Sequence, residues 1–459
     1  MGMNSMPTAL RDVVVPAFGV PLEAPSIPAT TYEKRCREAY SRAGCDWLVV
    51  YADREHLANI AFLSGYDPRF EEALLLLGPR DQRVLVVGNE GEAYAPLAGL
   101  PGLDIALAQS MSLMGQDRAL KPDLAAVLRE AGMSSGQTIG LAGWKYFEPA
   151  EWDDASPGLF VPHYLVAMLS RIARGSDALK DATPVLMHPT TGLRSTIDVD
   201  QIALHEWGAA RASAAVWRIL TGTRLGLSEM EAASAMGYAG EVLSAHVMVA
   251  TGDSSDPVIG LRSPGSRIAN RGDGVTAGVG YWGGLSARAG LIADHDEAFL
   301  KTAAAYFDGL IAWYEAADIG VAGEAVFAAV TGALARGGLR SALNPGHLTG
   351  HDEWIHTPIR PGSPERIAPG MPFQVDIIPT PMRAGWALNC EDGIVFADAA
   401  LRAELKARHP AVVERIEARR KFVRDELGIA IRDSILPLSS TPLCLPPFWL
   451  AAGRLLARV

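Results

Sequence analysis

Three short segments in the last quarter of the chain constrain its fold more than any other feature. Residues 344–356, NPGHLTGHDEWIH, hold three histidines, an Asp and a Glu, and a Pro-Gly pair precedes His347, so we expect His347 at a turn or the start of a strand. Two further acids lie in strand-like runs, MPFQVDII and ALNCEDGIVF. If the segments pack together, they form a compact acid–base or metal-binding cluster. Its candidate members are His347, His356, Asp376 and Glu391.

Size and charge narrow the classes of protein. A chain of 459 residues predicts two domains, because single cores stop growing well below this length. The net charge of −11 argues against a nucleic-acid or anionic-membrane partner. The four cysteines show no CxxC spacing, and no apolar run reaches membrane-spanning length. We therefore expect a reduced, cytoplasmic setting without a signal peptide.

The first part of the chain predicts an α/β domain. Residues 1–30 are rich in proline and small residues and predict an extended segment. Helical spacing over 31–46 and 120–133 alternates with apolar strand-like runs such as DWLVVYA and TIGLAGW. The run ANIAFLSG at 58–65 also predicts a strand. The alternation favours a domain over residues 31–175.

The second part predicts a larger domain over residues 190–430. Residues 173–195 indicate a linker, and two helices are expected, over 199–222 and from Ser228, with Glu231 completing a capping box. A strand, a tight glycine turn and a second strand follow over about 274–291. Residues 431–459 are apolar but contain several prolines, which predicts a packed tail.

The order and spacing of the motifs carry a resemblance. GHLTGHDEWIH, then PGMPFQVDIIP, then NCEDGIVF resembles the C-terminal half of the creatinase/aminopeptidase P family, and DWLVVYADREHLANIAFLSGY is similar to its N-terminal domain. The resemblance implies an α/β (α+β) protein, with a creatinase-like N-terminal domain followed by a pita-bread domain of curved antiparallel sheet flanked by helices. It also implies a homodimer.

The resemblance also exposes a departure at the metal site. The family's five metal-binding positions carry over to Thr276, Ala287, His347, Asp376 and Glu391, and the first two are not carboxylates. A catalytic histidine that the family often has falls near a valine at position 258. We therefore expect no dinuclear centre and no cofactor. The alternative is a single divalent ion (Mn, Fe, Co or Zn) held by the remaining three residues.

Creatinase is a metal-free member of the family, and the resemblance to it implies acid–base chemistry. His347 or His356 would act as the base, oriented by Asp376 or Glu391. An arginine beside the vacated metal position would bind a substrate carboxylate. The candidate substrate-binding residues are Arg288, Arg262 and Trp282 and, from the N-terminal domain, Tyr66 and Arg69.

Three functions stay open at this point. The first is a metal-independent hydrolase that cleaves a C–N bond in a small, carboxylate-bearing molecule. The second is an Xaa-Pro aminopeptidase-like metallopeptidase with a degenerate metal site, acting on short peptides. The third is a non-catalytic pita-bread module that binds a partner. The retained histidines and acids favour an enzyme over a binding module.

Overall fold

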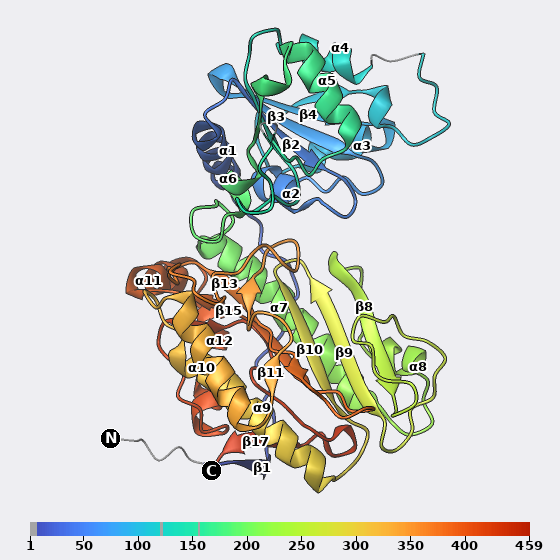
Figure 1. Ribbon diagram of the computed structural model, residues 1–459, viewed down its shortest axis with the longest axis vertical. Coiled ribbons are helices and arrows are strands. Elements are labelled where there is room, and N and C mark those ends of the chain that lie inside the picture. Colours follow the sequence, from blue (N-terminus) through green and yellow to red (C-terminus); the bar gives the residue numbers. More distant parts are fainter. Residues whose placement is uncertain (1–6, 120–122, 155–156) are drawn as a thin grey trace. The chain divides into compact units, whose positions relative to one another are not determined.

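The computed structural model describes residues 7–119, 123–154 and 157–459. They form two compact units, one over 27–195 and one over 196–459, and the second also includes the segment up to residue 26. The expectations for residues 1–6 of the extended segment and for 120–122 of the predicted helix lie outside the described residues. Figure 1 shows the two units, which are described separately below.

The N-terminal unit is built on a mixed sheet in the order β5-β4-β3-β2-β6-β7. The last strand pairs in parallel with β6, so the unit continues past residue 175 into the predicted linker. Its strands are β2 (Trp47–Ala52), β3 (Ala73–Gly78), β4 (Gln82–Val87), β5 (Asp104–Leu107), β6 (Ile139–Ala142) and β7 (Leu179–Asp181). Its helices are α1 (Ala29–Ala43), α2 (Ala58–Ser64), α3 (Asn89–Tyr94), α4 (Leu124–Glu130), α5 (His163–Ala173) and α6 (Thr183–Met187).

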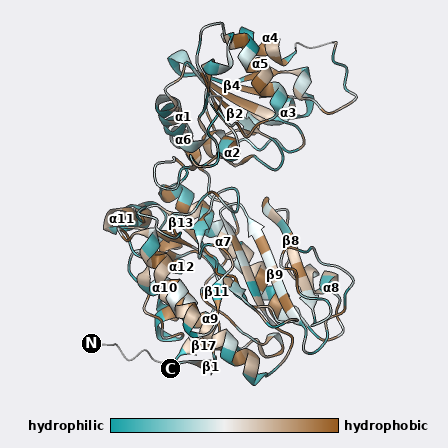
Figure 2. Cartoon of the chain, viewed as in Figure 1, coloured by the Kyte–Doolittle hydropathy of each residue, from teal (hydrophilic) through white to brown (hydrophobic). Residues whose placement is uncertain are grey.

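The central strands β2 and β3 of this unit are apolar along their whole length, and Figure 2 shows the hydrophobic colour of β2. Every residue of β2 and β3 is buried, as expected for central strands covered on both faces. The prediction of a strand over 58–65 is wrong, because Ala58–Ser64 form α2, which ends at Gly65 in the left-handed conformation. All seven residues of α2 are buried, and a short, wholly apolar run does not reveal its period.

The C-terminal unit contains an antiparallel sheet in the order β12-β13-β15-β10-β9-β8, with β16 paired to β15. These strands are β8 (Leu243–Gly252), β9 (Gly274–Tyr281), β10 (Gly284–Leu291), β12 (His347–Leu348), β13 (Pro372–Val375), β15 (Asn389–Phe396) and β16 (Ile435–Pro437). Its helices are α7 (Val199–Gly222), α8 (Glu229–Ser234), α9 (Glu297–Ala316), α10 (Gly323–Arg336), α11 (Ala399–Arg408) and α12 (Pro410–Asp425).

Helix α7 covers one face of this sheet. Its residues Val216 and Ile219 pack with Ala277 and Val279 of β9 in one apolar cluster. Because side chains alternate along a strand, the intervening residues of β9 lie on the opposite face. The predicted long helix over 199–222 is therefore confirmed, and it leaves one sheet face for the site.

Two smaller features complete the unit. The predicted capping box of Ser228 and Glu231 is present, and α8 ends at Ser234. Near the ends of the sequence, β1 (Thr8–Asp12) pairs antiparallel with β17 (Arg454–Arg458). A second two-stranded sheet is formed by β11 (Arg340–Ser341) and β14 (Pro379–Thr380). Among the helices of the described residues, none is both long and apolar enough to cross a membrane.

Candidate functional site

His347 begins the two-residue strand β12 and lies directly opposite Gln374 of β13. Gly346 before it has a φ of +105°, which favours glycine, and its backbone passes close to the Gln374 carbonyl. The Pro345 carbonyl accepts the indole N–H of Trp313 at 2.7 Å, which fixes the turn. His347 lies at a turn-to-strand junction, as predicted, and its imidazole is fully buried.

The loop after β12 folds back over His347. The N–H of Ile355 donates to the Leu348 carbonyl at 3.0 Å, which closes the loop. This return places Glu353 Oε1 2.9 Å from His347 Nε2. Trp354 stacks on the imidazole, with ring centroids 4.0 Å apart. His347 is therefore held between a carboxylate and an aromatic ring.

The two predicted acids come from the neighbouring strands. Asp376 directly follows β13, and Glu391 lies in β15 opposite Ala287 of β10. Gln374 Nε2 donates to Glu391 Oε1 at 3.1 Å. Both acids are nearly inaccessible to solvent.

A hydrogen-bond chain from α9 orients Asp376. The Tyr306 hydroxyl lies 3.3 Å from Asn389 Oδ1, and the side chain of Asn389 hydrogen-bonds to Asp376. The Oδ1 atom of Asp376 is buried and has no hydrogen-bond partner among the described residues. One oxygen of this carboxylate therefore stays available to a ligand.

Burial shifts the proton equilibria of the cluster. Burial raises the pKa of Asp376 to about 6, although the nearby His347 opposes the shift. Burial, with the Asp376 and Glu353 carboxylates, raises the pKa of Glu391 well above its ordinary value. Burial alone would lower the pKa of His347, but Glu353 and Asp376 more than offset it and the pKa is raised. Each shift reflects crowded negative charge in a dry site.

The donor set fits one divalent cation. One ligand atom from each of His347, Glu353 and Glu391 lies within 4.8 Å of the others. Across the described residues, no lysine or arginine forms an ion pair with Glu353, Asp376 or Glu391. Three carboxylates beside one imidazole thus carry excess negative charge, which a divalent cation would balance. The predicted ligand set was His347, Asp376 and Glu391. The donor set in the structure has Glu353 in place of Asp376, and Asp376 lies beside it.

Across the sheet, the same face carries no carboxylate on β9 or β10. Ala287 lies opposite Glu391 and Thr276 lies opposite Ala289, so both positions share the face of the site. The side chain of Met248 lies over Gly278, where an added Cβ would meet its Cε at 2.9 Å. These two strands therefore supply no carboxylate ligand for a second metal.

The structure does not bring all predicted substrate-binding residues to the cluster. Arg288 lies on the opposite face from Ala287, and internal acceptors occupy all of its N–H groups. The prediction that Arg288 binds a substrate carboxylate is therefore wrong. Arg262 bonds to Glu229 and to the Thr251 carbonyl. Trp282 contacts His351, in the loop after β12, edge to face at a centroid distance of 4.9 Å.

His356 forms a backbone bridge with Leu348, and its Nδ1 accepts the N–H of Thr357 at 2.8 Å. His347 and Leu348 are neighbours in β12, so their side chains face opposite sides. Because His356 lies opposite Leu348, it belongs to the face of Leu348 and not to that of His347. In the N-terminal unit, Tyr66 is buried and Arg69 pairs with Asp67 at 3.0 Å. The substrate-binding roles of Tyr66 and Arg69 stay predictions.

Three members of the site were not predicted from the sequence, namely Glu353, Gln374 and Asn389. Glu353 sits in a loop, and its place depends on the turn at Gly350, whose N–H donates to the Asp352 carbonyl at 2.9 Å. Gln374 and Asn389 lie two residues from Asp376 and Glu391, respectively, in the same strand-like runs. Because side chains two residues apart in a strand lie on the same face, Gln374 lies beside Asp376 and Asn389 lies beside Glu391. This alternation could have predicted both residues from the sequence.

No family model matches the chain, and no curated protein sequence does. Solved structures do match. An Xaa-Pro dipeptidase from Bacillus anthracis is 15% identical over 81% of this chain and 96% of its own, with a TM-score of 0.60.

Two further structures have similar coverage. A prolidase from Thermococcus sibiricus is 17% identical over 81% of this chain and 95% of its own, with a TM-score of 0.63. A dipeptidase, PepE, from Mycobacterium ulcerans is 19% identical over 81% of this chain and 94% of its own, with a TM-score of 0.59. At these identities the likeness establishes the fold, and it confirms the fold class expected from the motifs.

Proposed function

We propose that this chain, which has the two-domain pita-bread fold of the prolidase and Xaa-Pro dipeptidase structures, hydrolyses a C–N bond in a small or short-peptide substrate. The observation that carries the proposal is the convergence of His347, Glu353 and Glu391, with ligand atoms within 4.8 Å of one another. A buried histidine and a buried carboxylate with raised pKa values, beside a partly buried acid, are typical of catalytic sites. The titles of the similar structures, which name dipeptidases and prolidases, support a dipeptide as the first substrate to test.

We further propose that His347, Glu353 and Glu391 hold one divalent cation. A bound cation of this kind polarises a scissile carbonyl and lowers the pKa of a bound water. Asp376 would then take up and return the proton, because its buried Oδ1 has no hydrogen-bond partner among the described residues. Asn389 holds the carboxylate in place and leaves Oδ1 for the proton.

Metal analysis tests this proposal directly. Protein purified without chelator should contain about one equivalent of Mn, Fe, Co or Zn, in keeping with a single donor set. The His347→Ala variant should contain none, whereas His163→Ala, which alters an exposed histidine at the start of α5, should retain it. Each protein is then assayed for hydrolysis of a series of Xaa-Pro dipeptides. Wild type that neither binds metal nor turns over would contradict the proposal.

A metal-independent hydrolase is the second candidate. The missing carboxylates at Thr276 and Ala287 favour it, because a dinuclear centre has too few ligands here. Under this candidate, hydrolysis persists in chelator with metal-free protein and is lost in Asp376→Asn. A protein that binds dipeptides without cleaving them would instead be a non-catalytic module. We also propose a homodimer, which light scattering of the purified protein tests.

A further inference from the structure

Behind the site, one arginine is buried completely. Arg288 of β10 lies opposite Cys390 of β15, next to the pair formed by Ala287 and Glu391. Ala287 and Glu391 share the face that carries the site, so Arg288 points to the other face. Its side chain has no solvent exposure. A buried guanidinium is costly unless all of its donors are paired.

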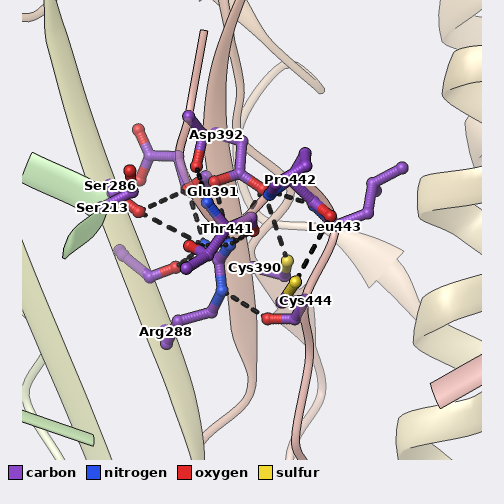
Figure 3. Close-up of polar contacts among 12 residues, drawn as sticks. Ser213, Ser286, Arg288, Cys390, Glu391, Asp392, Thr441, Pro442, Leu443 and Cys444 are labelled. Carbon is purple, nitrogen blue, oxygen red and sulfur yellow. Dashed lines mark hydrogen bonds and ion pairs between the residues drawn. The ribbon is translucent and has the colours of Figure 1, made fainter. Parts of the chain in front are cut away.

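The contacts of Arg288 satisfy that condition, as Figure 3 shows. Nη1 donates to the carbonyls of Ala287 and Glu391, each at 2.8 Å. Nη2 donates to the Asp392 carboxylate at 2.9 Å and to the Thr441 carbonyl at 2.6 Å. Nε donates to the Cys444 carbonyl at 2.7 Å. All five N–H groups are used, so none is left for a substrate carboxylate.

These contacts join the site strand to the C-terminal segment. Asp392 accepts the N–H of Leu443 at 2.8 Å as well as the Arg288 pair. Residues 441–444 are therefore fastened to β15 at the residue that follows Glu391. Only a planar guanidinium has five donors spread widely enough for this set of acceptors, so lysine cannot reproduce it.

Glu391 is consequently held from two sides. Behind the sheet, its carbonyl accepts from Arg288 Nη1 at 2.8 Å and from Ser286 Oγ at 3.2 Å. In front, its carboxylate accepts from Gln374 Nε2 at 3.1 Å. The backbone position set from behind determines where the carboxylate meets His347 and Glu353.

We propose that Arg288 is a positioning residue that fixes Glu391 for cation binding, with residues 441–444 as the support against which it braces the strand. The proposal rests on the proposed function, since it assumes that Glu391 is a ligand. It assigns Arg288 a role in place of the substrate contact expected from the sequence. It also makes the C-terminal segment part of the site's support.

The test compares two buried arginines. Arg419 of α12 is also unexposed and pairs with the buried Glu206 at 2.7 Å, and among the described residues it forms no hydrogen bond or ion pair with the cluster. Arg288→Met, Arg288→Lys and Arg419→Met are purified, and Mn²⁺ binding is measured by calorimetry beside thermal unfolding. We expect both methionine variants to lose thermal stability. Only the Arg288 variants should bind Mn²⁺ about 10- to 100-fold more weakly, as when partners that orient metal ligands are removed.

The lysine variant separates support from charge. It keeps a cation beside Asp392, so thermal stability should recover relative to Arg288→Met, whereas Mn²⁺ affinity should stay at least about 10-fold weak. Equal affinity losses in Arg288→Met and Arg419→Met, or full recovery of affinity in Arg288→Lys, would overturn the proposal.

Failure of the proposed function gives a different result. Wild type that binds no Mn²⁺ contradicts the cation site itself. The positioning role is then decided by crystal structures of wild type and Arg288→Met. A Glu391 carboxylate displaced from Gln374 in the variant supports the role, and an unmoved carboxylate overturns it.

Discussion

One row of side chains crosses the larger sheet and changes character halfway. Met248, Gly278, Ala287 and Glu391 lie opposite one another on β8, β9, β10 and β15. The first three are small or apolar, and we call them the apolar half of the row. Glu391 belongs to the buried polar cluster around His347, and we call Glu391 and this cluster the polar half. The two halves have the same strand geometry and share one face of the sheet.

The difference separates what the fold needs from what the site needs. The opposite face of β9 packs against α7 through residues such as Ala277 and Val279, and this packing does not involve the row. The carboxylates of the polar half cost free energy to bury, and the proposed cation would offset that cost. Strands β8, β9 and β10, which carry the apolar half, pair in the same way without a buried carboxylate in the row. The fold of the sheet therefore does not depend on the candidate ligand residues.

Removing the charge of the polar half should have the largest effect. In Glu391→Gln, shape and most packing are kept, but an anionic ligand atom is lost. We expect Mn²⁺ affinity and dipeptide hydrolysis to fall by more than about 100-fold, beyond the loss seen for partners that only orient ligands. Calorimetry and steady-state kinetics measure both. Glu404→Gln, on the exposed surface of α11, serves as control and should match wild type.

Adding charge to the apolar half should have the next largest effect. Ala287→Asp places a carboxylate opposite Glu391, and in chelator we expect a loss of at least about 2 kcal/mol in the free energy of unfolding. Mn²⁺ should restore part of that stability, because the new carboxylate can bind it. Chemical denaturation with and without Mn²⁺ measures the difference. An equal response in Ala287→Asn, which adds bulk without charge, would contradict the explanation.

Packing in the apolar half predicts a smaller, cation-independent effect. Met248 packs with Leu285 and Ala287, so Met248→Ala should lower the free energy of unfolding by about 2 kcal/mol through a cavity. The loss should be the same in Mn²⁺ and in chelator. Met230→Ala removes an exposed side chain and should change stability by less than about 0.5 kcal/mol. A cation-dependent loss in Met248→Ala would break the distinction between the halves.

Hydrogen bonds behind the polar half predict the smallest effect. Tyr306→Phe removes the hydroxyl that accepts the Cys390 N–H at 2.9 Å and contacts Asn389. We expect a loss of about 1 kcal/mol in the free energy of unfolding. Tyr238→Phe alters a half-exposed tyrosine and should be neutral in the same denaturation assay. If Tyr306→Phe loses no free energy of unfolding, the hydrogen bonds of the Tyr306 hydroxyl do not stabilise the polar half.

The sequence predicted the strand-borne part of the site better than the rest. His347, Asp376 and Glu391 lie in or beside strands whose pattern is visible, and the structure brings them together. Glu353 was not predicted because the path of the loop after β12 depends on turn geometry, and the spacing of residues along the sequence does not reveal it. His356 was expected in the cluster, but its pairing with Leu348 sets it on the other face.

Two other expectations failed for identifiable reasons. Arg288 follows Ala287, and in a strand neighbouring residues face opposite sides, so a site-facing Ala287 already excluded a site-facing Arg288. Ala58–Ser64 form a helix because a wholly apolar run of this length fits a buried helix as well as a strand. The fold class itself was predictable, since order and spacing of motifs survive where single residues change.

The pairing of β1 with β17 has a consequence for the order of events during synthesis. Thr8 lies opposite Arg458, so β1 cannot find its partner until residues 454–458 have left the ribosome. Residues 27–195, by contrast, form a continuous unit that can fold while the remainder is still being translated. The first of the described strands to emerge is thus among the last of them to be placed, and until then its edge is open to chaperones or to misplaced pairing.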